Sequence, residues 1–135
     1  MKNNKYYRVY AEINLDAIVK NVDNLMALTK ENTGALAVVK AGGYGHGDVA
    51  VAKAVAQKVT GYAVATLDEA VNLRENGVKK PILVLGYVDP YEFDILVSHE
   101  ITATVFDVET AQLLADAARA VSYTHLRAHE TRGNL

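Results

Sequence analysis

The sequence has no cysteine and no long apolar run, and each absence excludes a class of protein. Without cysteine among its 135 residues, the chain has no disulfide framework, no thiolate nucleophile and no cysteine-ligated zinc. No run of apolar residues approaches the roughly 20 that are needed to cross a bilayer. The opening residues, MKNNKY, lack the apolar core of a signal peptide, so we expect a cytoplasmic protein.

The chain also lacks an excess of charge of one sign. Its 14 lysines and arginines stand against 16 aspartates and glutamates. This balance offers no basic surface for nucleic acid or an anionic membrane, so we expect a small-molecule partner, with no nucleic acid and no membrane. We also expect no metal site, because Leu126 follows His125 where the zinc-protease pattern with His129 would need glutamate.

What the chain does contain is an alternation of helical and extended patterns. Apolar residues recur at steps of three and four from Leu15 to Leu28, which predicts an amphipathic helix whose apolar side faces a sheet. Short apolar runs predict strands at 36–39, 62–65, 82–85 and 102–105, and the first of them is expected to be buried on both faces. Such alternation predicts a parallel sheet with helical crossovers, either an open doubly wound sheet or part of a (β/α)8 barrel.

Capping residues mark where the helices are expected to begin. The predicted starts are Asn14 or Asp16, Asp48, Thr66 with Glu69 in a capping box, Asp89 before Pro90, and Asp107. The helix that starts at Asp48 is expected to run to about Lys58, and Gly77 is expected to close the helix that starts at Thr66.

Lys40 stands where the first predicted strand ends, in the run KAGGYGHG at 40–47. In both candidate folds this edge of the sheet carries the active site. A lysine amine in an apolar setting is the usual group that forms a Schiff base with a carbonyl cofactor. Tyr44, one short turn further, could hydrogen-bond an anionic group of the same ligand.

Simpler interpretations of this run stay open on residue type alone. Lys40 can merely reach solvent, the glycines can merely make the turn, and His46 is interpreted as a hydrogen-bonding turn residue. A phosphate loop is disfavoured, because G-x-x-x-x-G-K-[ST] places its lysine after the glycines, and G-x-G-x-x-G would need glycine where Asp48 stands.

The run AVVKAGGYGHG at 37–47 resembles the pyridoxal-phosphate attachment signature of alanine racemases. Further segments resemble the N-terminal part of that family in the same order: EINLDAI at 12–18, YAVATLDEA at 62–70, LRENG at 73–77 and PILVLG at 81–86. The resemblance covers about the first 120 residues and implies a (β/α)8 barrel that binds pyridoxal 5'-phosphate. The sequence departs from the family at Gly42, where Asn or Asp is usual, so a side-chain hydrogen bond of the turn is expected to be absent.

The resemblance also implies roles for individual residues. Lys40 would be the catalytic and cofactor-binding residue, which holds the cofactor and then moves the α-proton on one face of the amino acid. Tyr44 would contact the cofactor's phosphate. The family's second acid/base is a tyrosine from the C-terminal domain of the partner subunit in a homodimer, and it has no counterpart in these 135 residues. The implied reaction interconverts L-alanine and D-alanine, which supplies D-alanine for cell-wall peptidoglycan, and we expect the chain to be inactive alone.

The predicted strands number about four, whereas a complete barrel of this type needs eight strands and about 250 residues. We therefore expect residues 1–121 to form roughly the first half of the N-terminal barrel domain. The segment SYTHLRAHETRGNL at 122–135 continues no strand or helix of the family, and we expect it to be a non-native tail.

Two related functions remain as alternatives. A non-enzymatic pyridoxal-phosphate homeostasis protein typically has Thr-Lys-Pro after its lysine, where this chain has AGG at 41–43. A related barrel amino-acid decarboxylase lacks the YGHG continuation that this chain has at 44–47. The YGHG run favours the racemase, and the choice between alanine, serine and a broader substrate range stays open.

Overall fold

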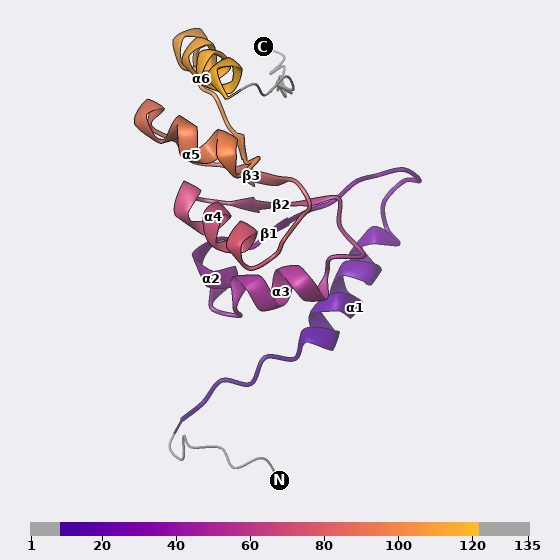
Figure 1. The fold of residues 1–135 in the computed structure, drawn as a ribbon. Helices are drawn as coiled ribbons and strands as arrows, with labels where there is room; N and C mark the ends of the chain where they lie inside the picture. The colour runs from indigo at the N-terminus through magenta and orange to yellow at the C-terminus, as the bar shows by residue number, and fades with distance from the viewer. Residues whose placement is uncertain (1–8, 122–135) are drawn as a thin grey trace.

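A computed structural model of the chain describes residues 9–121, and the segments 1–8 and 122–135 lie outside the described residues. Strands and helices alternate as predicted (Figure 1). The elements are α1 (Leu15–Met26), β1 (Leu36–Val38), α2 (Lys40–Tyr44), α3 (Asp48–Ala54), β2 (Gly61–Val64), α4 (Leu67–Glu75), β3 (Ile82–Val84), the 3-10 helix η1 (Pro90–Glu92), α5 (Phe93–Ser98), β4 (Thr102–Ala103) and α6 (Val108–Ala120). The predicted boundary at residue 121 and the tail beyond it stay predictions.

The strands form one parallel sheet in the order β1-β2-β3-β4. Ala37 pairs with Tyr62, Tyr62 pairs with Ile82, and Leu83 pairs with Thr102. Because every pair is parallel, the carboxyl ends of all the strands lie at the same edge of the sheet. The predicted parallel sheet with helical crossovers is confirmed, and this edge is where the site is expected.

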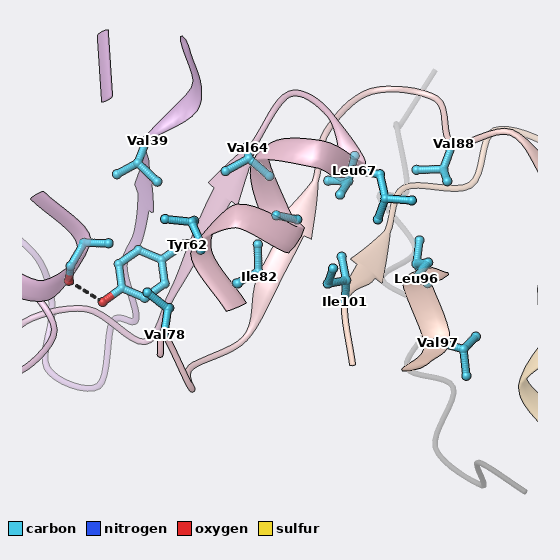
Figure 2. Packing of buried hydrophobic residues seen from close by; sticks show 14 of the residues in the cluster. Val39, Tyr62, Val64, Leu67, Val78, Ile82, Val88, Leu96, Val97 and Ile101 are labelled. Carbon is cyan, nitrogen blue, oxygen red and sulfur yellow. Dashed lines mark hydrogen bonds between the residues drawn. The ribbon is translucent and has the colours of Figure 1, made fainter. Parts of the chain in front are cut away.

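One face of the sheet carries the hydrophobic core. Tyr62, Val64, Ile82 and Val84 point to this face and are at most 1% exposed. Part of the cluster is shown in Figure 2. Its members from α3 to α6 are Val51, Ala52, Leu67, Ala70, Leu73, Phe93, Leu96, Val97, Leu114 and Ala118, and the remaining members, outside these helices, are Val39, Val55, Val59, Val78, Val88 and Ile101. Full burial of such a side chain contributes about 1.5–3 kcal/mol, so this face fixes the sheet on which the site stands.

The first strand is not buried on both faces, contrary to the prediction. Leu36 and Val38 are 50% and 42% exposed, and only the side chain between them, Ala37, packs against the core cluster. β1 lies at the edge of the sheet, and its second face has no helix over it among the described residues. An apolar run of this kind indicates a strand, but it does not show which of its two faces the rest of the fold covers.

The apolar side of α1 packs mainly beside α3, not on the sheet as predicted (Figure 1). Ile18 and Val22 lie against the core cluster, whereas Leu25 and Leu28 at the end of the pattern are 64% and 86% exposed. An ion pair of 2.8 Å between Asp23 and Lys58 ties α1 to the loop after α3.

Most of the predicted helix starts are confirmed. The side chains of Asn14, Thr66 and Asp107 each accept a hydrogen bond from the backbone N–H three residues later, at 3.0, 3.4 and 2.7 Å. Asp89 caps η1 in a similar manner, because its side chain accepts a hydrogen bond from the Tyr91 N–H, two residues later, at 3.3 Å. The contacts of Thr66, Asp89 and Asp107 lie between β2, β3 and β4 and the helices that follow them.

Asp48 does not cap α3, because Gly47 occupies the cap position and Asp48 is the first helical residue. The Asp48 carboxylate accepts from the Val49 N–H at 2.7 Å and from Asn72 Nδ2 at 3.0 Å, so it ties the start of α3 to α4. The helix also ends at Ala54, before the predicted end near residue 58.

The turn after β1 is left-handed. Ala41, Gly42 and Gly43 have φ of 52°, 61° and 63° with ψ of 49°, 37° and 40°, and Tyr44 and Gly45 follow with φ of 56° and 81°. The N–H groups of Gly43 and Gly45 donate to the carbonyls four residues earlier, at 2.9 and 3.1 Å. This conformation costs about 1–2 kcal/mol for each non-glycine residue, here Ala41 and Tyr44, and nothing for glycine. The usual Asn or Asp at position 42 belongs to the side chains that tolerate the same region, so Gly42 preserves the backbone conformation.

The Tyr62 hydroxyl donates a hydrogen bond of 2.6 Å to the Ala52 carbonyl in the last turn of α3 (Figure 2). Tyr62→Phe would leave this buried carbonyl without its partner, and we expect a loss of about 1–3 kcal/mol in the free energy of unfolding. Urea unfolding followed by circular dichroism measures the loss. Tyr91→Phe is the matched control, because Tyr91 is 81% exposed and its hydroxyl is not needed for packing. Equal stability of the two variants would contradict the assigned role.

Burial raises the pKa of Tyr62 above its ordinary value of 10.0. The folded chain therefore keeps this proton at pH values where the unfolded chain releases it, and the free energy of unfolding should fall as the pH rises above 10. We expect Tyr62→Phe to lose this part of the pH dependence while Tyr91→Phe retains it. The same slope above pH 10 in all three proteins would be evidence against the prediction.

A side chain at Gly42 would cause only conformational strain, whereas a side chain at Gly43 would also cause a steric conflict. A Cβ at Gly42 would meet nothing within 4 Å, whereas a Cβ at Gly43 would lie 3.1 Å from the Asp48 nitrogen and 3.3 Å from its Cα. We expect Gly42→Ala to cost about 1–2 kcal/mol for the left-handed conformation alone, and Gly43→Ala to cost at least about 1 kcal/mol more. Urea unfolding of both variants tests this order, which similar losses would refute.

Candidate active site

Lys40 leaves the sheet at its carboxyl edge, directly after the buried Val39. The Val39 N–H donates to the Ala63 carbonyl at 2.9 Å, so the pairing of β1 with β2 continues to the residue before Lys40. Lys40 is half-buried. Within residues 9–121 the ion pairs are Lys58 with Asp23 and Arg119 with Asp116, so no described carboxylate neutralises the Lys40 ammonium.

The left-handed turn brings Lys40 and Tyr44 together, and their roles as two contacts of one ligand stay predictions. Lys40 Nζ lies 5.9 Å from the centroid of the Tyr44 ring, which is within the range of a cation–π contact. Tyr44 is 60% exposed, so its ring lines the open side of the turn. An amine and a phenol therefore share one small region at the carboxyl edge.

His46 stabilises the turn, which confirms its interpretation as a turn residue. Its Nδ1–H donates to the carbonyls of Gly43 and Tyr44, both at 3.1 Å. Both carbonyls lie within the left-handed segment, and the Gly43 carbonyl also accepts from the His46 backbone N–H at 3.1 Å. The side chain is therefore engaged with the backbone of the loop that carries Tyr44.

Glu69 belongs to this region, although the sequence indicated only its capping role. Its Oε1 accepts from the Ala41 N–H at 2.7 Å, and its Oε2 accepts from the N–H groups of Ala65 and Thr66 at 2.7 and 3.4 Å. The capping box predicted the contact with Thr66. The contact with Ala41 spans 28 residues and depends on the alignment of β1 with β2, which no local pattern reports.

The ends of β2 and β3 meet closely at the same edge. The Gly86 N–H donates to the Ala65 carbonyl at 3.1 Å, and a Cβ at Gly86 would lie only 2.5 Å from that oxygen. Only glycine fits this approach. Two exposed aromatic residues follow the neighbouring strands, Tyr87 after β3 and Phe106 after β4, at 58% and 62% exposed.

The described residues offer an amine, a phenol and aromatic surface at this edge, and no cluster of metal ligands. Within residues 9–121 no group of three or more His, Cys, Asp or Glu side chains could hold a metal ion. No helix in the same part of the chain is long and apolar enough to cross a membrane.

Comparison with known proteins gives consistent matches. A family model described as the alanine racemase N-terminal domain matches residues 13–129. Alanine racemase 1 of Bacillus subtilis is 43% identical over 131 residues, which cover 96% of this chain and 33% of that protein. The structure of Clostridium difficile alanine racemase in complex with cycloserine has a TM-score of 0.84 at 39% identity, covering 88% of this chain and 32% of that one. The structure of Bacillus anthracis alanine racemase with bound L-Ala-P has a TM-score of 0.76 at 37% identity, covering 84% and 30%.

The chain spans about a third of the length of the curated relatives that it matches. Its alternating strands and helices with one parallel sheet have the α/β fold predicted for a (β/α)8 barrel domain that is truncated to roughly its first half. The motif, the fold and the family match agree, and the chain belongs to the alanine racemase N-terminal domain family.

Proposed function

We propose that this chain supplies the lysine-bearing part of a pyridoxal 5'-phosphate-dependent racemase that interconverts L-alanine and D-alanine. The observation that carries the proposal is the half-buried Lys40 amine beside the Tyr44 ring at the carboxyl edge of the sheet. The similar alanine racemases support this reaction over a non-enzymatic cofactor carrier or a decarboxylase. The complete protein would be a cytoplasmic homodimer that supplies D-alanine for the cell wall.

The residues at the edge fit the proposed cofactor. A lysine amine is the group that attacks the aldehyde of such a cofactor. No described carboxylate forms an ion pair with Lys40, so the side chain is available for an aldehyde. The Tyr44 hydroxyl, on the same turn, is a donor that suits a phosphate oxygen.

The chemistry follows from these two side chains. When bound, pyridoxal phosphate withdraws electrons from the α-carbon of an attached amino acid and makes its α-proton acidic. Lys40 Nζ would hold the cofactor covalently and, once the substrate amine has replaced it, accept and return the α-proton on one face. Tyr44 would anchor the phosphate by donating its hydroxyl proton. Racemisation also needs an acid/base on the opposite face, which the family resemblance assigns to a tyrosine of the partner subunit.

Lys40 should be the lysine that binds pyridoxal phosphate covalently. We expect borohydride reduction of the chain with the cofactor, followed by peptide mapping, to place the label on Lys40. Lys53 is the internal control, because it is an exposed lysine on the neighbouring α3. Lys40→Arg should abolish the specific label, since a guanidinium stays protonated and does not attack the aldehyde. A label on Lys53 with none on Lys40 would contradict the proposal.

Tyr44→Phe should weaken cofactor binding, because it removes a hydrogen bond to a charged phosphate but retains the ring beside Lys40. We expect a loss of about 1.5–3 kcal/mol, which is roughly 10-fold to 150-fold in the dissociation constant from an absorbance titration. Tyr10→Phe is the control, since Tyr10 is 65% exposed and precedes α1. An unchanged affinity would mean that Tyr44 contributes only its ring.

A further inference from the structure

The Glu69 carboxylate joins the ends of two strands. One oxygen accepts from the Ala41 N–H after β1 at 2.7 Å, and the other accepts from the Ala65 N–H after β2 at 2.7 Å. The half-buried side chain comes from α4, which lies beside α2 (Figure 1). Both hydrogen bonds are charge-assisted, and such bonds are roughly twice as strong as neutral ones.

The contact with Ala41 goes beyond what a capping box requires. A capping box needs one glutamate oxygen to return to the cap residue, and Oε2 does this at Thr66 and Ala65. Oε1 is then available, and it reaches the loop that carries Lys40. A second capping box at Asp89 and Glu92 shows the simpler case, because the Glu92 carboxylate returns to its own cap, at 3.4 Å.

The Ala41 N–H is part of the peptide unit that joins Lys40 to Ala41. An acceptor fixed at this N–H therefore fixes the plane of the peptide bond that follows Lys40. Ala41, with φ of 52°, is the first residue of the left-handed turn. Its Cβ makes this conformation unfavourable, so the conformation needs support from its surroundings. The turn that starts there brings Tyr44 to Lys40 Nζ.

We propose that Glu69 is a positioning residue for Lys40. It accepts the Ala41 N–H, fixes the peptide plane after Lys40, and so holds the amine and Tyr44 in the arrangement that receives a carbonyl ligand. This inference rests on the proposed function, because it assigns Lys40 as the group that reacts. Glu69 itself touches neither substrate nor cofactor and acts through the backbone.

The decisive variants are E69Q and E92Q. Glutamine has one acceptor oxygen, and its NH2 group would face an N–H donor, so E69Q can satisfy only one of the two strand ends. E92Q makes the same change in the other capping box, away from Lys40. T66A removes the hydroxyl that caps α4 but retains the Glu69 carboxylate, so it reports the effect of weakening α4 alone.

Two measurements test the proposal on the full chain. Amide hydrogen exchange reports whether the Ala41 N–H has lost its acceptor, and the rate of borohydride-trapped labelling with pyridoxal phosphate reports how Lys40 is held. For E69Q we expect Ala41 to exchange about 10-fold faster or more and Lys40 to be labelled about 10-fold more slowly, whereas E92Q and T66A stay within about 2-fold of the original chain. E69D, which is too short to reach both strand ends, should repeat the pattern and replaces E69Q if that variant does not fold.

The possible results separate the two proposals. If E69Q and E92Q have the same Ala41 exchange and the same Lys40 labelling, the positioning role is wrong and the proposed function stands. If T66A slows Lys40 labelling as much as E69Q does, the effect comes from α4 and the positioning role is again wrong. If Lys40 of the original chain is not labelled at all, the proposed function fails, and the positioning role fails with it.

Discussion

The parallel pairing of β1 with β2 is the interaction on which the candidate site depends. Its last backbone hydrogen bond joins the Val39 N–H to the Ala63 carbonyl at 2.9 Å, one residue before Lys40. Val39 is 2% exposed, so burial and pairing together fix the chain up to the start of the left-handed turn. The same pairing brings the end of β2, with Ala65, beside the end of β1, so that the Glu69 carboxylate can accept hydrogen bonds from both strand ends. The core on the helix-covered face thus sets the direction in which the lysine leaves the sheet.

Features with a local cause could be predicted from the sequence. The starts of α1, α4 and α6 follow from Asn14, Thr66 and Asp107, because each side chain bonds a backbone N–H only three residues away. Gly77, with φ of 85°, closes α4 for an equally local reason. Lys40 could be placed at a strand end because the apolar run stops there. In each case the physical cause and its effect lie within about one helical turn of chain.

Features that depend on distant partners could not be predicted. Asp48 is of a residue type that commonly caps helices, but its carboxylate binds Asn72, which is 24 residues further along the chain. The second oxygen of Glu69 reaches Ala41 only because the sheet aligns two loops that are 28 residues apart. The exposed face of β1 depends on which elements cover it, and a strand pattern does not contain that information. The glycines indicated that positive φ is available, but glycine permits both hands, so the continuous left-handed path from 41 to 45 is a property of the folded loop.

The left-handed turn restricts the number of residues between Lys40 and Tyr44 more than it restricts the types of those residues. A helical turn of either hand repeats after about 3.6 residues, so a side chain four positions later returns to nearly the same side. Lys40 and Tyr44 have this separation, and the amine lies 5.9 Å from the ring centroid. One residue inserted or deleted between them would swing the ring away by about 100°, whereas a side chain at Gly42 would point into open space. Relatives that keep the amine and the phenol together should therefore vary at the tip of this loop among residues that accept the left-handed region, but carry no insertion or deletion within it.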